Sequence, residues 1–143
     1  MNAPPPQPRP SSVPVGPLVA AVGAVLLIVS LFLDWYDGVT GFTVFELLDL
    51  LLVLLALATI ASLADALGFW GGPRPSRGVS LAVALFTVFV VASQVINDPP
   101  AVANGGADQD VGIWLALGGS VVMAVGALLA YARISLSVEA RRR

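Results

Sequence analysis

The feature that most constrains this chain is a set of four long apolar segments, each bounded by residues that start or end helices. An α-helix needs about 20 mostly apolar residues to cross about 30 Å of hydrocarbon. Hydrophobic residues make up 57% of the 143 residues and charged residues only 11%, against about 25% in an average soluble domain. We therefore expect an all-α fold, an integral membrane four-helix bundle, with helices at about 17–34, 44–67, 79–96 and 112–132.

The positions of the cationic side chains predict the orientation of these helices. All seven are arginines: Arg9, Arg74, Arg77, Arg133, Arg141, Arg142 and Arg143. With four spans, every arginine falls in the N-terminal tail, the connection 68–78 or the C-terminal tail. Because positive residues beside membrane spans are kept on the cytoplasmic side, we expect both termini to be cytoplasmic. The arginine-free connections 34–43 and 97–111 would then face outward.

The two ends of the chain are predicted to be tails outside a transmembrane domain of residues 17–133. Residues 1–16 are rich in proline and have little to bury, so we expect a disordered cytoplasmic tail. The alternative is a polyproline II ligand for a partner domain. Residues 134–143 would form a basic cytoplasmic tail. The first apolar segment lacks a small-x-small cleavage site, which favours a retained anchor over a cleaved signal peptide.

Acidic residues gather between the first two apolar segments, in the stretch LFLDWYDGVTGFTVFELLDL (Leu31–Leu50). Trp35 and Tyr36 follow the first predicted helix directly, where aromatic side chains typically anchor a helix at the membrane interface. Asp34 and Asp37 flank them, at the expected boundary with water. Since all arginines are expected inside, an anionic outer face follows from the topology alone.

The same stretch carries a signal for the start of the second helix. Thr43 and Glu46 have the spacing of a capping box, in which each side chain accepts from the other residue's backbone N–H. Phe42 and Leu47 are then placed as the hydrophobic staple that accompanies such a box. This interpretation gives Glu46 a structural role.

Asp49 lies one turn beyond Glu46 on the same helix face. Asp49 and Asp65 are sixteen residues apart, about 24 Å along a helix, so each would lie about 3 Å inside the hydrocarbon. An intramembrane carboxylate indicates a functional site by default, but this shallow depth favours an interfacial or packing role. The candidates for binding a cation or proton are Glu46, Asp49, Asp34 and Gln94. Oxygen ligands suit a hard cation such as Ca²⁺, but no EF-hand spacing is present and we predict no metal site or cofactor.

The fourth segment carries the clearest packing signal. Its small residues recur at helical spacing and predict a face that another helix approaches closely: Gly112, Ala116, Gly119 and Gly126. Small residues also follow four-residue steps in the first segment (Gly16, Ala20, Ala24) and in the second (Ala58, Ser62, Ala66). These faces suit packing inside the bundle, while one left towards lipid would suit a dimer or a larger complex. Asp110 is placed to cap the fourth helix.

Missing residue types exclude much chemistry. The chain has no histidine and no cysteine, which removes the usual zinc ligands, disulfides and thiol nucleophiles. Lysine is also absent, so neither a Schiff base nor a P-loop lysine is available. The predicted connections are much shorter than the 50 or so residues of a small domain. We do not expect an enzyme or a nucleic-acid-binding protein.

Two stretches resemble a known group of membrane proteins. They are SLFLDWYDG followed by GFTVFELLDLLLVLLALATI, and the later GIWLALGGSVVMAVGALLAYAR. This pattern, over residues 16–133, is similar to small four-helix membrane proteins of unassigned function in actinobacteria and related high-GC bacteria. The resemblance implies a bacterial plasma membrane, a multi-pass topology and no known activity. Members of that group often have proline at the position of Asp34 and tryptophan at that of Phe45.

Two classes of function remain open from the sequence. In the first, the protein is a structural or accessory subunit whose helix faces bind a membrane protein partner or copies of itself. In the second, it binds or translocates a cation or proton through its outer carboxylates. The unbroken apolar run 50–58 favours the first class, because it leaves no polar path inward from Asp49.

Overall fold

The computed structural model describes residues 14–44, 47–69, 76–97 and 108–132, and these are mostly helical. The long helices are α1 (Val15–Ser30), α3 (Leu48–Ala66), α4 (Arg77–Ile96) and α6 (Val111–Tyr131). A two-stranded hairpin, β1 (Asp34–Tyr36) with β2 (Val39–Thr40), and the single-turn helix α2 (Gly41–Val44) connect α1 to α3. Glu46, residues 1–13 and residues 133–143 lie outside the described residues, and α1 begins at Val15, so the last two residues of the predicted N-terminal tail are helical.

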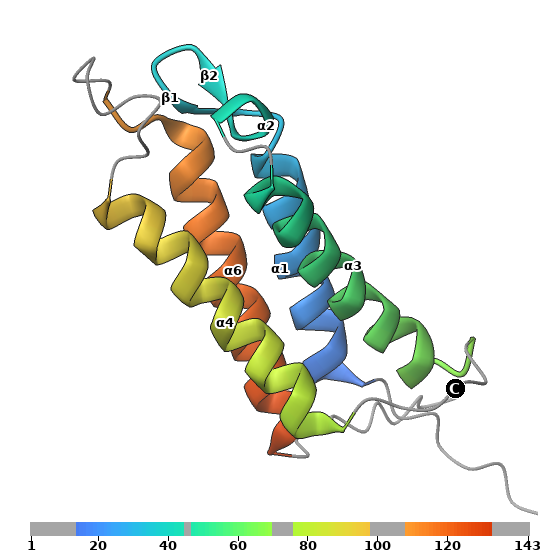
Figure 1. Cartoon of the computed structure of the whole chain (residues 1–143). Coiled ribbons are helices and arrows are strands. Elements are labelled where there is room, and N and C mark those ends of the chain that lie inside the picture. Colours follow the sequence, from blue (N-terminus) through green and yellow to red (C-terminus); the bar gives the residue numbers. More distant parts are fainter. Residues whose placement is uncertain (1–13, 45–46, 70–75, 98–107, 133–143) are drawn as a thin grey trace, which may run out of the picture.

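The four long helices lie side by side and alternate in direction along the chain (Figure 1). Helix α1 packs most extensively against α6, and α6 also packs against α4. Helix α3 packs against α1 and, less extensively, against α4. The hairpin covers the end at which α1 and α4 finish and α3 and α6 begin (Figure 1). Arg77 lies at the opposite end, where α4 begins.

Three of the described helices, α3, α4 and α6, are long and apolar enough to cross a membrane. Helix α1 has 16 residues and is shorter than the expected span of residues 17–34. It ends at Ser30 because the amides of residues 31–33 each donate to the carbonyl three residues earlier, at 3.1–3.2 Å. This tighter turn stops the α-helical hydrogen bonding and leads the chain into β1.

The predicted start of the second helix is wrong. Helix α3 begins at Leu48, its N-cap is Leu47, and no side chain caps it. Thr43 belongs to α2, and its hydroxyl lies 2.8 Å from the Thr40 hydroxyl oxygen. The physical reason is that residues 41 and 42 fold back on the end of α1, where their amides donate to the carbonyls of residues 33 and 31.

The predicted hydrophobic staple is also not formed. The Phe42 ring packs edge-on against Phe32, with ring centroids 5.0 Å apart. Leu47, the other member of the expected pair, is 80% exposed. Phe42 therefore stabilises the contact between α2 and the turn after α1.

Small residues bring the backbones of α1 and α6 into direct contact. Gly119 is buried, and a Cβ there would lie 2.9 Å from the Leu27 nitrogen. A Cβ on Gly23 would meet the backbone of Met123, and one on Gly126 would meet the backbone of Ala20. Real Cβ atoms do not approach backbone atoms so closely, so these positions require glycine. Such close packing is a main source of helix association in a membrane, where lipid is as apolar as the helix surface.

Helix α3 contributes less of its small-residue face to the interior. Its buried residues are Asp49, Leu52, Ala56 and Thr59, which recur at helical spacing. Ala58 and Ala66, from the stripe noted in the sequence, are exposed, and Ser62 is half-buried. The small residues of α1 and α6 are thus used inside the protein, whereas much of the α3 stripe faces out.

We expect Gly126→Ala to lower the free energy of unfolding by about 1–3 kcal/mol, the usual cost of overpacking, because the added Cβ meets the Ala20 backbone. Gly118 is the matched control, since it is exposed on the same helix with nothing within 4 Å of an added Cβ. Gly118→Ala should be neutral or stabilising by up to about 1 kcal/mol from helix propensity. Thermal unfolding in detergent, followed by circular dichroism, measures both. Equal melting temperatures would contradict the close α1–α6 contact.

Candidate functional site

The hairpin and residues 108–110 together cover one end of the helices, and we call them the hairpin cap. β1 pairs antiparallel with β2 on one side and forms a bridge from Tyr36 to Gln109 on the other. The Asp37 amide donates to the Asp108 carbonyl at 3.3 Å, and the Asp110 amide donates to the Trp35 carbonyl at 2.9 Å. The connection before α3 and the entry to α6 are therefore held together by one small sheet.

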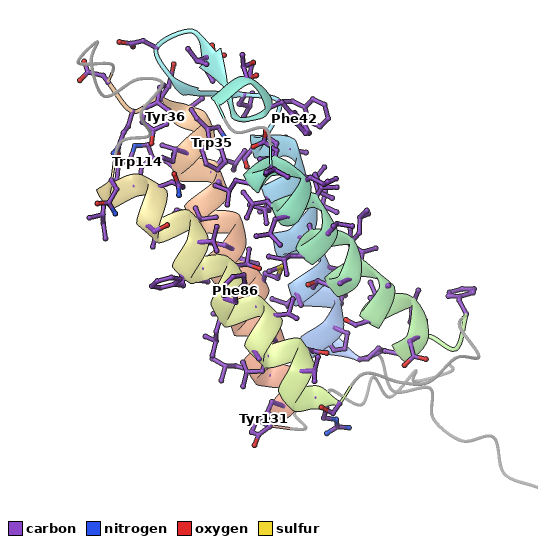
Figure 2. All side chains as sticks on the ribbon, in the orientation of Figure 1. Trp35, Tyr36, Phe42, Phe86, Trp114 and Tyr131 are labelled. Carbon is purple, nitrogen blue, oxygen red and sulfur yellow. The ribbon has the colours of Figure 1, made fainter. Side chains whose placement is uncertain are left out.

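Trp35 and Tyr36 fill the cap from below, and both are fully buried (Figure 2). The Trp35 indole N–H donates to the Ser30 carbonyl at 2.8 Å, and the Tyr36 hydroxyl donates to the Gln94 carbonyl at 2.8 Å. Both rings therefore pack inside the protein, and their predicted position at a membrane interface stays a prediction. Successive strand residues normally point to opposite faces, but a register shift between Asp34 and Tyr36 lets both rings turn inward.

A hairpin signal in the sequence was missed. Asp37-Gly38 is a dipeptide typical of tight hairpin turns, and Gly38 adopts φ +70°, a conformation that side chains with a Cβ rarely reach. The flanking strands have only three and two residues, which is too short for an alternating pattern to stand out. Because long apolar runs on both sides favour helices, the sequence predicted only a connection between two helices at residues 34–43.

Several acids of this region have structural roles in the cap. The Asp37 carboxylate accepts from the Asp108 amide at 3.2 Å. The predicted cap of the last helix is confirmed, because the Asp110 side chain accepts from the Val111 amide at 2.6 Å. The Asp34 carbonyl lies against Gly112, where a Cβ would come within 2.6 Å of it. These contacts fix the position at which α6 begins.

Among the described residues, the cation candidates Asp34, Asp49 and Gln94 lie on three different elements. Gln94 uses its backbone carbonyl to bind Tyr36, and its side-chain amide donates to the Ser93 hydroxyl at 3.3 Å. Asp34 lies in β1 and Asp49 in α3, while Glu46 is outside the described residues. Within the described ranges, no group of three or more acidic side chains could hold a metal ion.

Asp49 is the exceptional side chain at this end of the molecule. It lies in the first turn of α3, and its buried neighbours Leu52 and Ala56 share the same helix face. Only 3% of Asp49 is exposed, so its side chain is buried within the protein, while its predicted shallow depth in a bilayer stays a prediction. Its Oδ1 atom is buried without a hydrogen-bond partner among the residues described. Buried polar atoms are nearly always hydrogen-bonded, so this one requires an explanation.

The other buried polar residues are hydroxyls that bind only their own helices. Each donates to a carbonyl three or four residues earlier, at 2.6–3.0 Å: Ser30, Thr59, Thr87 and Ser120. None of these hydrogen bonds joins two helices. The described interior therefore has no chain of hydrogen-bonded side chains leading away from Asp49.

The chain was compared with protein-family models, with curated proteins and with solved structures, and none of them matches. Its function must therefore be inferred from the geometry of its own residues. The features available for that inference are the hairpin cap, the isolated Asp49 carboxyl, and the apolar outer surface of the long helices.

We expect Tyr36→Phe to lower the free energy of unfolding by about 1 kcal/mol, because it removes the hydrogen bond that ties the cap to Gln94 on α4. Tyr131→Phe is the control, since Tyr131 is 56% exposed at the far end of α6 (Figure 2). Thermal unfolding in detergent compares the two variants. The role of the cap in holding α4 would be refuted if the two changes had the same effect.

Proposed function

We propose that this protein is a multi-pass membrane protein that acts as a structural or accessory subunit through contacts between helices, and not as an enzyme. In this proposal all four long helices cross the bilayer, both termini are cytoplasmic and the hairpin cap faces outward. The observation that carries it is the apolar outer surface of the long helices.

The outer surface supports placement in lipid. Large apolar side chains point outward from every long helix, including Val25 on α1, Leu54 on α3 and Phe89 on α4, which are 49%, 55% and 69% exposed. Soluble monomers rarely expose continuous apolar patches of more than a few hundred Å². In lipid the same surface carries no such penalty.

Aromatic residues on α6 also fit a bilayer. Trp114 and Tyr131 are both more than half exposed and lie near opposite ends of the helix (Figure 2). They are seventeen residues apart, which corresponds to about 26 Å along an α-helix. Trp and Tyr are enriched at the two interfaces of a bilayer whose hydrocarbon is about 30 Å thick. A bacterial plasma membrane is proposed on the resemblance noted in the sequence.

The geometry limits where a partner would bind. The small residues of α1 and α6 are occupied within the protein, so Gly119→Leu would disrupt the fold itself and would not report on a partner. A partner, or a second copy, would have to contact the outer helix surfaces or the cap. The alternative function, cation or proton binding or translocation through outer carboxylates, draws support from the isolated Asp49 carboxyl.

The orientation can be tested with single cysteines, because the chain has none of its own. Asp108→Cys, in the cap, should react with a membrane-impermeant maleimide on intact cells, since Asp108 is exposed and expected outside. Gly78→Cys, at the exposed start of α4, should react only after the membrane is permeabilised. Labelling of both from one side would contradict the crossing of α4.

The accessory role predicts a stoichiometric partner or a homo-oligomer. Mild-detergent purification from the native host, with mass spectrometry and light scattering, should find one of these. Outward side chains are then replaced one helix at a time: Leu54→Ala, Phe89→Ala and Val125→Ala. A replacement that removes a contact with the partner should raise the Kd of the complex about tenfold, which corresponds to about 1.4 kcal/mol. Helical content should be retained, because these side chains face away from the interior.

A lone monomer without co-eluting protein would contradict the accessory role. The alternative function would then be tested by proton and cation flux into liposomes. Wild type would be compared with the double variant Glu46→Gln/Asp49→Asn, and equal flux would exclude the outer carboxylates as a translocation site.

A further inference from the structure

The unpartnered oxygen of Asp49 points to a ligand that the protein itself does not supply. The side chain is 3% exposed, and Oδ1 is buried without a hydrogen-bond partner in the described part of the chain. Leu52 and Ala56, both fully buried, continue the same face of α3 towards the centre of the molecule. A carboxylate left charged in such surroundings would carry a large desolvation cost.

The elements packed around Asp49 provide no cation to balance such a charge. Helix α1 has no titratable side chain, and the only one in α4 is Arg77, at the opposite end of the molecule (Figure 1). Tyr131, the only titratable side chain in α6, also lies at that opposite end. Asp65 is sixteen residues further along α3. The cap contributes no cation: its titratable groups are the Tyr36 hydroxyl and the carboxyl groups of Asp34, Asp37, Asp108 and Asp110.

The described residues also form no cluster of acids for a metal ion. Ca²⁺ takes about six to eight oxygen ligands, and no cluster of three acids occurs among the described residues. The carbonyls where α1 ends accept hydrogen bonds within the protein. Ser30 O accepts from the Trp35 indole, Leu31 O from the Phe42 amide, and Leu33 O from the Gly41 amide. A proton, by contrast, needs a single carboxylate oxygen.

We propose that Asp49 is a proton-binding site at the capped end of the helices. The carboxylate and a hydronium ion from the capped side give a neutral carboxylic acid and water, so one O–H bond forms and one breaks. This proposal goes beyond the accessory role. Of the proposed function, it uses only the placement of the protein in a membrane.

Chemical labelling tests the site directly. Dicyclohexylcarbodiimide reacts with protonated carboxyl groups in apolar surroundings. Purified wild-type protein in detergent at neutral pH should gain one adduct, mapped by peptide mass spectrometry to Asp49. Asp49→Asn should lose the adduct, and Asp37→Asn should retain it, because Asp37 is exposed. Labelling of wild type should fall as the pH is raised.

Two results would overturn the proposal. The first is folded wild-type protein with no adduct at Asp49, including labelling confined to Glu46 or another acid. The second is a melting temperature that rises with Na⁺ or Ca²⁺ at constant pH and ionic strength in wild type but not in Asp49→Asn, which would assign the site to a metal ion.

The mapping on wild type decides the question even if Asp49→Asn fails to fold. It also separates this proposal from the accessory role. An adduct at Asp49 does not depend on a partner, and a partner can co-purify whether or not Asp49 is labelled.

Discussion

The close backbone contact between α1 and α6 is the interaction on which the rest of the structure depends. It runs from Gly126 against Ala20, through Gly119 against Leu27, to Gly112 against the Asp34 carbonyl. Because this line continues into the cap, it fixes where the hairpin lies as well as how the helices pack. In lipid, where apolar burial alone does not hold helices together, such van der Waals contact takes on that role. Helices α3 and α4 are then placed by packing against this pair.

The sequence predicted the later helices better than the earlier ones. The expected spans 79–96 and 112–132 differ by at most two residues from the helices at 77–96 and 111–131, because apolar length and flanking breakers both mark them. The first two spans are bounded by the cap and by α2, which contain short strands and a single helical turn. The amides of residues 41 and 42 donate to carbonyls at the end of α1, and neither helical nor strand periodicity predicts that pairing. The tighter turn at residues 31–33 and the contact of residues 41 and 42 with it, and not hydrophobic periodicity, mark those boundaries.

The candidate site was only partly foreseeable. Asp49 was identified as unusual, but its burial within the protein and its unpartnered Oδ1 depend on packing between elements, which helical spacing alone does not reveal. The burial of Trp35 and Tyr36 depends on a register shift that composition does not reveal. The contact of Gly23 with α6 was not predicted. The predicted stripe in the first segment follows four-residue steps to Ala24, whereas the contact with α6 also uses Gly23, the residue before it.

The pairing of α1 with α6 joins the first long helix of the chain to the last. About 80 residues separate the end of α1 from the start of α6, so the central contact of the fold has high sequence separation. At synthesis rates of about 5–20 residues per second, α6 emerges several seconds after α1. During that interval the glycine face of α1 lacks the partner against which it packs, and α3 and α4 are synthesised beside an incomplete pair. The contact between α1 and α6 therefore forms only after α6 has been synthesised, although it is the contact on which the other long helices depend.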